Sequence, residues 1–80
     1  MYRVIMLNDD FTTQDFVVDV LINIFKKTSS DAFKIMMNIH TKGSGDCGIY
    51  IYDIARTKVM QVKDSAKRRG FPLRCTIEEA

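Results

Sequence analysis

The chain has 80 residues, of which 46% are hydrophobic and 28% are charged, and its formal net charge at pH 7 is +2. This composition is typical of an ordinary folded protein and excludes intrinsic disorder. The length predicts one domain over residues 1–80. No apolar run approaches the ~20 residues that a bilayer span requires, so we expect no membrane partner.

The two cysteines, Cys47 and Cys75, are too few for a disulfide scaffold, and no secretory signal precedes them. Each lies in an alternating apolar stretch, where a free cysteine behaves as a small hydrophobic residue. We therefore expect reduced core thiols in a cytoplasmic protein. A bridge between the two thiols, or a reactive thiol, is the alternative.

The first predicted elements are a strand and a helix joined by a polar turn. Residues 2–7 are apolar and rich in β-branched side chains, and they stop at the turn cluster Asn8-Asp9-Asp10. Thr12 and Thr13 each offer an N-cap for a helix of about residues 13–27. Its apolar residues recur at helical spacing: Phe16, Val17, Val20, Leu21, Ile24 and Phe25.

A second helix and a second strand follow. Ser29 or Ser30 starts the helix, and Gly43 is a natural C-terminal stop. Glycines predict a loop over residues 42–46, and residues 47–52 then form a strand. The apolar stripe of the helix consists of Ala32, Ile35, Met36 and Ile39.

Asp53 is a candidate N-cap for a third helix. The cations at 67–69 and Gly70 predict where this helix ends. Its stripe is Ala55, Val59, Val62 and Ala66. Residues 73–78 alternate as a half-buried strand. The predicted order is β-α-α-β-α-β, an α+β fold in which three helices cover one face of a three-stranded antiparallel sheet.

Four polar residues are the candidates for function: Asn8-Asp9-Asp10 and His40. A structural explanation exists for each, because asparagine and aspartate bond their own backbone in turns and histidine suits the last turn of a helix. Met36, Ile39 and His40 share one helix face. From spacing alone, Met36 and Ile39 are core residues.

Catalysis and metal binding are poorly supported. The chain has one histidine, no nucleophile in a recognisable catalytic motif and no glycine-rich phosphate loop. Metal binding through His40 and the two aspartates is conceivable, but a lone histidine with no spaced partner usually falls short of the three or four protein ligands of a zinc site. We expect no enzyme, no cofactor and no metal.

A basic cluster ends the third helix and consists of Lys63, Lys67, Arg68 and Arg69. An RNA-binding face is one interpretation. No aromatic residue interleaves with these cations, so a solvated helix end is the favoured interpretation and we expect no nucleic-acid partner.

Taken together, the chain resembles the ClpS family of Clp-protease adaptors. An Asn-Asp-Asp turn, a distant apolar-x-x-apolar-His pattern and a final Pro-Leu-x-Cys-Thr form a specific combination, and the resemblance covers nearly the whole chain. The predicted element order also agrees with the ClpS fold, which is similar to the C-terminal domain of a ribosomal stalk protein. The matching stretches are Tyr2 to Thr12, Phe16 to Leu21, Met36 to His40, Cys47-Gly48, Ala55 to Val59 and Pro72 to Glu78.

The resemblance implies a cytoplasmic, monomeric adaptor that binds the first residue of a protein when it is Leu, Phe, Tyr or Trp. It implies delivery of that substrate to the N-domain of a hexameric unfoldase, ClpA or ClpC, for degradation by ClpP. A small RNA- or ribosome-associated binding module is the alternative.

The resemblance also implies residue roles. Asn8 and His40 contact the substrate's amine, while Asp9 and Asp10 fix the first peptide group and the turn. The amide oxygen, carboxylates and neutral imidazole are acceptors that suit a cationic amine. A chain-internal residue would leave them unpaired. The implied hydrophobic pocket consists of Met6, Thr12, Gln14, Val17, Met36, Ile39 and Leu73, and the implied unfoldase-docking residues are Asp53, Thr57 and Lys58.

Two features depart from the family pattern. Gln14 stands where many members have a methionine that lines the pocket and disfavours β-branched residues. The family also has a flexible N-terminal extension, whereas Met1 almost abuts the first strand. Either the chain is shortened or this member lacks the extension.

Overall fold

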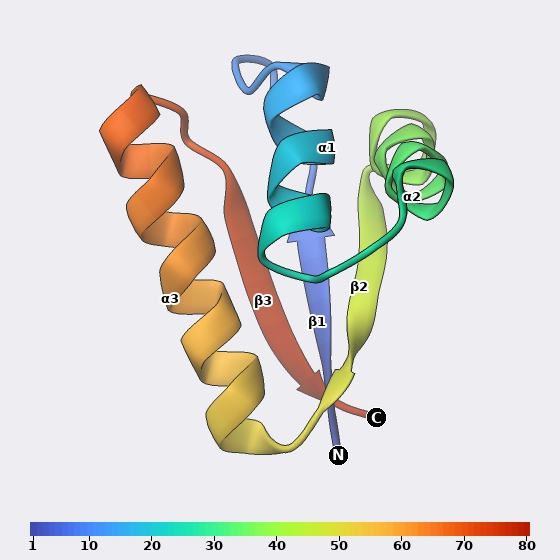
Figure 1. Ribbon diagram of the computed structural model, residues 1–80, viewed down its shortest axis with the longest axis vertical. Helices are drawn as coiled ribbons and strands as arrows, with labels where there is room; N and C mark the ends of the chain where they lie inside the picture. Colours follow the sequence, from blue (N-terminus) through green and yellow to red (C-terminus); the bar gives the residue numbers. More distant parts are fainter.

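The three strands form one antiparallel sheet in the order β2-β1-β3, as the computed structural model of residues 1–80 shows (Figure 1). The strands are β1 (Tyr2–Leu7), β2 (Ser44–Tyr50) and β3 (Arg74–Glu79). The helices are α1 (Gln14–Asn23), α2 (Ser29–Lys42) and α3 (Tyr52–Arg69). The predicted fold class and element order are confirmed.

The core lies between the sheet and the helices. Val4 and Met6 of β1 are fully buried, and alternation along the strand turns Arg3 toward the other face. There Arg3 pairs with Asp46 of β2 at 2.8 Å and with Glu78 of β3 at 3.6 Å. Because one face buries apolar side chains and the other carries charges, the three helices share the apolar face.

Helix α1 is shorter than predicted. Its apolar pattern continues through Ile24 and Phe25, but Lys26 has a φ of 56°, in the left-handed region. The N–H of Lys27 then donates to the carbonyl of Leu21 at 3.1 Å. Lysine gives no sequence signal for a left-handed residue, so the expected extension to residue 27 was wrong.

Other boundaries also differ from the prediction, and β2 ends at Tyr50 because Tyr52 already belongs to α3. Strand β2 begins at Ser44, inside the predicted loop, because residues 44–46 pair with the end of β1. The N-cap of α3 is Ile51, which makes no side-chain cap bond. Asp53 therefore lies in the first turn and is not the cap that we predicted. Thr28 caps α2, where its hydroxyl accepts the Asp31 N–H at 3.1 Å.

Both cysteines are free, as predicted. Cys47 and Cys75 lie on strands that flank β1, so their Cα atoms are about two strand spacings, roughly 9–10 Å, apart. This separation exceeds the reach of a disulfide. A hydrogen bond with Cys47, together with burial, raises the pKa of the Cys75 thiol, which disfavours the reactive thiolate.

Candidate functional site

The turn that follows β1 is built around the carboxylate of Asp9. Its Oδ1 accepts the N–H groups of Phe11 at 2.8 Å and Thr12 at 2.6 Å, and its Oδ2 accepts the Thr12 hydroxyl at 2.7 Å. Partial burial by itself would raise the pKa of Asp9, but these three hydrogen bonds outweigh it and lower the pKa. Asp9 is therefore an anion at neutral pH and holds the turn in one conformation.

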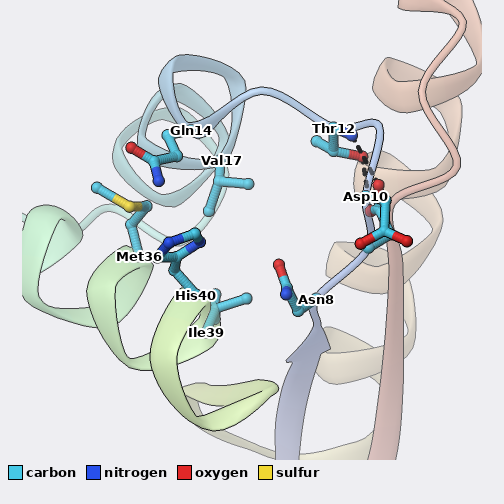
Figure 2. Close-up of a pocket in the computed structure, with 9 residues that line it drawn as sticks. Asn8, Asp10, Thr12, Gln14, Val17, Met36, Ile39 and His40 are labelled. Atoms are coloured by element: carbon cyan, nitrogen blue, oxygen red, sulfur yellow. Dashed lines mark hydrogen bonds between the residues drawn. The ribbon is translucent and has the colours of Figure 1, made fainter.

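Asn8 is placed beside the end of α2 by the β1–β2 pairing. The N–H of Asn8 donates to the carbonyl of Gly43 at 2.9 Å, which continues the ladder one residue beyond Leu7. Gly43 is the C-cap of α2, with a φ of 92°, where glycine is the favoured residue. His40 lies in the last turn of the same helix, so the two polar residues face each other although 32 positions separate them (Figure 2).

The apolar side of the site comes from α1 and α2. Thr13 caps α1 by accepting the Phe16 N–H at 3.2 Å, and Gln14 is the first helical residue. Val17 lies one turn further, opposite Met36 and Ile39 of α2. These last three side chains are buried, with exposed fractions of 6%, 4% and 3% in that order.

Gly45 allows β2 to approach α2 closely enough to place Ile39. A Cβ at Gly45 would stand 2.6 Å from Cγ1 of Ile39 and 3.2 Å from the carbonyl oxygen of Ile35. The sequence indicated only that Gly45 belonged to a loop. A glycine next to an alternating strand was the signal for close backbone approach, and we did not predict this role.

These elements enclose a cavity of about 260 Å³. All four predicted polar residues line it, together with five of the predicted pocket residues: Asn8, Asp9, Asp10, Thr12, Gln14, Val17, Met36, Ile39 and His40. Figure 2 shows Gln14, Met36 and His40 on the side of the helices, with Asn8, Thr12 and Asp10 opposite them at the end of β1 and in the turn that follows it. An apolar cavity of about 150 Å³ holds benzene, so this one has room for a leucine or phenylalanine side chain.

Two predicted pocket residues lie outside this lining. Met6 is fully buried under the site, and Leu73 is 4% exposed beside α3 and β3. Both belong to the core that supports the cavity. Gln14 is exposed at the cavity edge, and its amide makes no hydrogen bond within the chain.

The predicted docking residues lie on the first turns of α3. Asp53 is exposed, and its carbonyl oxygen accepts the Thr57 hydroxyl at 2.9 Å. Lys58 instead donates from Nζ to the carbonyl of Ile24 at 2.7 Å, and its ammonium lies 5.8 Å and 5.2 Å from the ring centroids of Phe25 and Tyr50. Lys58 is therefore engaged within the protein.

The chemistry of the site is that of binding. The cavity mouth offers an amide oxygen, carboxylates and an imidazole, all of which accept hydrogen bonds from a cation, while the cavity floor is apolar. The chain has no group of three or more His, Cys, Asp or Glu side chains placed to hold a metal ion. None of its helices combines the length and apolar character of a membrane span.

Comparison with known proteins gives a consistent result. The model of the family "ATP-dependent Clp protease adaptor protein ClpS" matches residues 1–76. The ATP-dependent Clp protease adapter protein ClpS of Acetivibrio thermocellus is 54% identical over 78 residues, which cover 98% of this chain and 76% of that protein. Its counterpart in Maricaulis maris is 52% identical over 79 residues, covering 99% and 72%.

A solved structure is similar as well. Agrobacterium tumefaciens ClpS2 bound to L-phenylalaninamide superposes with a TM-score of 0.92 at 39% sequence identity. The match covers 96% of this chain and 93% of that one.

Proposed function

This chain belongs to the ClpS family of adaptors of the ATP-dependent Clp protease, and we propose that it captures proteins whose first residue is Leu, Phe, Tyr or Trp. It then delivers them to the N-domain of a Clp unfoldase, ClpA or ClpC, for degradation by ClpP. As an adaptor, it binds substrate for the protease and catalyses no reaction itself.

One observation carries this proposal: the cavity joins hydrogen-bond acceptors at its mouth to an apolar floor. The N-terminal residue of a protein has the matching chemistry, because its cationic amine and its side chain are attached to the same Cα atom. Asn8 and His40 accept from the amine, and Asp9 and Asp10 supply negative charge. The ligand of Agrobacterium ClpS2, L-phenylalaninamide, has a free amine beside an aromatic side chain, and this supports the same mode here.

The magnitudes are sufficient for useful binding. Burying a leucine or phenylalanine side chain contributes about 1.5–3 kcal/mol. Each hydrogen bond to the charged amine contributes about 1.5–3 kcal/mol. After the cost of association, a dissociation constant near 1 μM, which corresponds to about −8 kcal/mol, is within reach.

The test is a fluorescence-anisotropy titration with labelled peptides that differ only in their first residue. Peptides that begin with Leu, Phe, Tyr or Trp should bind, while those that begin with Ala or Glu, and an N-acetylated Phe peptide, should not. Asn8→Ala should weaken the Phe peptide at least tenfold, because one charged hydrogen bond is worth about 1.5–3 kcal/mol. Asn38→Ala, an exposed residue of α2 outside the cavity lining, is the matched control. Equal binding of all first residues would refute the proposal.

We propose the first turns of α3 as the unfoldase-docking surface. Asp53 is flanked by exposed apolar residues: Ile51 at 55%, Tyr52 at 48% and Ile54 at 46%. Large exposed apolar side chains around a polar group are typical of a protein-binding surface. Asp53→Lys should weaken binding to the isolated unfoldase N-domain and leave the affinity for Phe peptides unchanged. We expect the adaptor to act as a monomer, which sedimentation of the free protein tests.

A further inference from the structure

A basic groove runs between α3 and β3, which lie side by side along the edge of the molecule (Figure 1). It consists of two adjoining recesses of about 260 Å³ each, both lined by Lys63, Leu73 and Arg74. Lys67 and Phe71 belong to one recess, and Val59 belongs to the other. We call these six residues the cationic groove.

The cations of the cationic groove make no ion pair within the chain. Lys63, Lys67 and Arg74 are exposed, and no acidic residue lines either recess. The ion pairs of the chain both belong to Arg3, which lies elsewhere on the sheet. The groove therefore presents three cations that make no ion pair, beside an apolar floor that includes Val59 and Leu73.

A third recess connects the cationic groove to the amine-binding cavity. Its volume is about 370 Å³, and it is lined by residues 7–11 on one side and by Pro72 and Arg74 on the other. It shares Asn8, Asp9 and Asp10 with the cavity and shares Arg74 with the groove. Arg74 pairs with Leu7 in the sheet, one residue before the turn. A substrate peptide whose first residue occupies the cavity, and whose chain then crosses the turn, therefore reaches Arg74 next.

We propose that the substrate segment behind the first residue lies in this third recess and continues along the cationic groove, so that the protein prefers N-terminal segments with acidic and apolar residues beyond the third position. This inference rests on the proposed capture of N-terminal residues and adds a second determinant of substrate choice. An extended peptide fits because alternate side chains point to opposite sides, which lets acidic residues face the cations while apolar ones face the floor.

Position along the peptide matters, because the turn itself is anionic. Asp9 and Asp10 line the recess that the second and third residues would cross. Acidic residues there meet like charge and weaken binding. Acidic residues that reach Arg74 and Lys63 meet opposite charge and strengthen it.

The surroundings favour a peptide over a nucleic acid. Base recognition in single strands relies on exposed aromatic faces. The aromatic ring of the groove, Phe71, is half-buried and is occupied by Phe16 at 5.0 Å between ring centroids and by the Arg69 guanidinium at 5.9 Å. The groove therefore offers charge and apolar surface without a free stacking platform.

The experiment compares three labelled Phe-initiated peptides of equal length. The first peptide carries Asp-Leu-Glu-Leu at positions 4–7. The second, neutral peptide carries Asn-Leu-Gln-Leu at the same positions. The third peptide carries two acidic residues at positions 2 and 3. At low salt the first should bind about three- to tenfold more tightly than the neutral one, since each exposed ion pair is worth about 0.2–1 kcal/mol. The third should bind more weakly than the neutral one, and 0.5 M salt should reduce both differences.

Variants assign the effect to the cationic groove. The double variant Lys63→Gln with Arg74→Gln should lose the preference for the first peptide and keep the affinity for the neutral one within about twofold. Lys34→Gln removes an exposed cation of α2 that lines none of these recesses, and it should keep the preference.

The outcomes separate the two proposals. Equal binding of the acidic and neutral peptides, or a preference that survives in the double variant, overturns the groove assignment while the capture of first residues stands. Failure of every Phe-initiated peptide to bind overturns both. A labelled 12-nucleotide RNA that binds the parent, loses affinity in the double variant and displaces no peptide would assign the groove to nucleic acid and overturn this inference.

Discussion

Replacing Lys58 with methionine should destabilise the fold, because the ammonium of Lys58 holds two distant segments together. Its Nζ donates to the carbonyl of Ile24, the C-cap of α1, at 2.7 Å. The last carbonyls of a helix have no partner within the helix, so this bond satisfies a group that the left-handed Lys26 leaves exposed. The same ammonium lies within cation–π range of two rings.

The expected loss follows from these contacts. A hydrogen bond to a charged donor is worth about 1.5–3 kcal/mol. A cation–π contact adds roughly 0.5–1 kcal/mol at a partly exposed site. Water can replace part of the bond to Ile24, and the released side chain regains rotamer freedom worth up to about 2 kcal/mol. The net decrease in the free energy of unfolding is therefore about 1–2 kcal/mol, which lowers Tm by roughly 5–15 °C in a domain of this size.

Urea denaturation of Lys58→Met, with Lys34→Met as the control, measures this loss. Lys34 is exposed on α2 and makes no hydrogen bond or ion pair within the chain, so its replacement should leave stability within about 0.5 kcal/mol of the parent. A Lys58→Met protein that unfolds at the same urea concentration as the control would refute this stabilising role of Lys58. In that case, any loss of unfoldase binding by Lys58→Met would be assigned to the docking surface and not to a destabilised fold. If Lys58 does stabilise the fold, Asp53→Lys is the better test of the docking surface, because Asp53 is exposed.

Four further predictions concern the site. Asp9→Asn should weaken the turn. Because the pKa of Asp9 is lowered in the folded state, the stability lost in this variant should be constant from pH 8 to 5 and should decline as the pH falls below the ordinary value of 3.8 and through the lowered pKa of the folded state; a difference that does not decline below pH 3.8 contradicts this. His40→Ala should weaken the Phe peptide at least tenfold, because the cationic amine loses one hydrogen-bond acceptor; unchanged affinity would show that His40 does not contact the amine. Gln14→Met should tighten Leu and Phe peptides and penalise Ile and Val by about 1 kcal/mol, since methionine adds an apolar wall; superimposable profiles would show that Gln14 does not contact the substrate. Gly45→Ala should cost about 1–3 kcal/mol of stability and weaken peptide binding, because its Cβ meets Ile39 at 2.6 Å; Ser44→Ala is the control, and unchanged binding would show that Ile39 is not placed by this contact.

The element types and their order were predictable because they depend on local chemistry. Period-two and helical patterns of apolar residues, threonine caps and terminal glycines act over a few residues, and the structure retains them. The boundaries that were wrong lie where a tertiary contact replaces a local signal. Helix α1 ends where Lys58 and Lys27 donate hydrogen bonds to its last carbonyl oxygens. Strand β2 begins where β1 pairs with glycine-rich residues.

The candidate site was predictable only in part. Nothing in the spacing of Asn8 and His40 indicates that they meet, and the family resemblance supplied that expectation. Their proximity follows from the hydrogen bond between Asn8 and Gly43, which is a consequence of strand pairing. The roles that the resemblance implied did not indicate that Lys58 bonds to α1 or that a basic groove adjoins the cavity, because both features depend on contacts between segments that are distant in the chain.

By itself, the sequence determined the α+β class, the six elements and the acidic turn after β1, since hydrophobic periodicity and capping are properties of neighbouring residues. The tertiary structure alone decided which face of each element meets another, how closely β2 approaches α2 at Gly45, and whether each cation is free or engaged. These features depend on contacts between residues that are distant in the chain, and such contacts form only when the core packs.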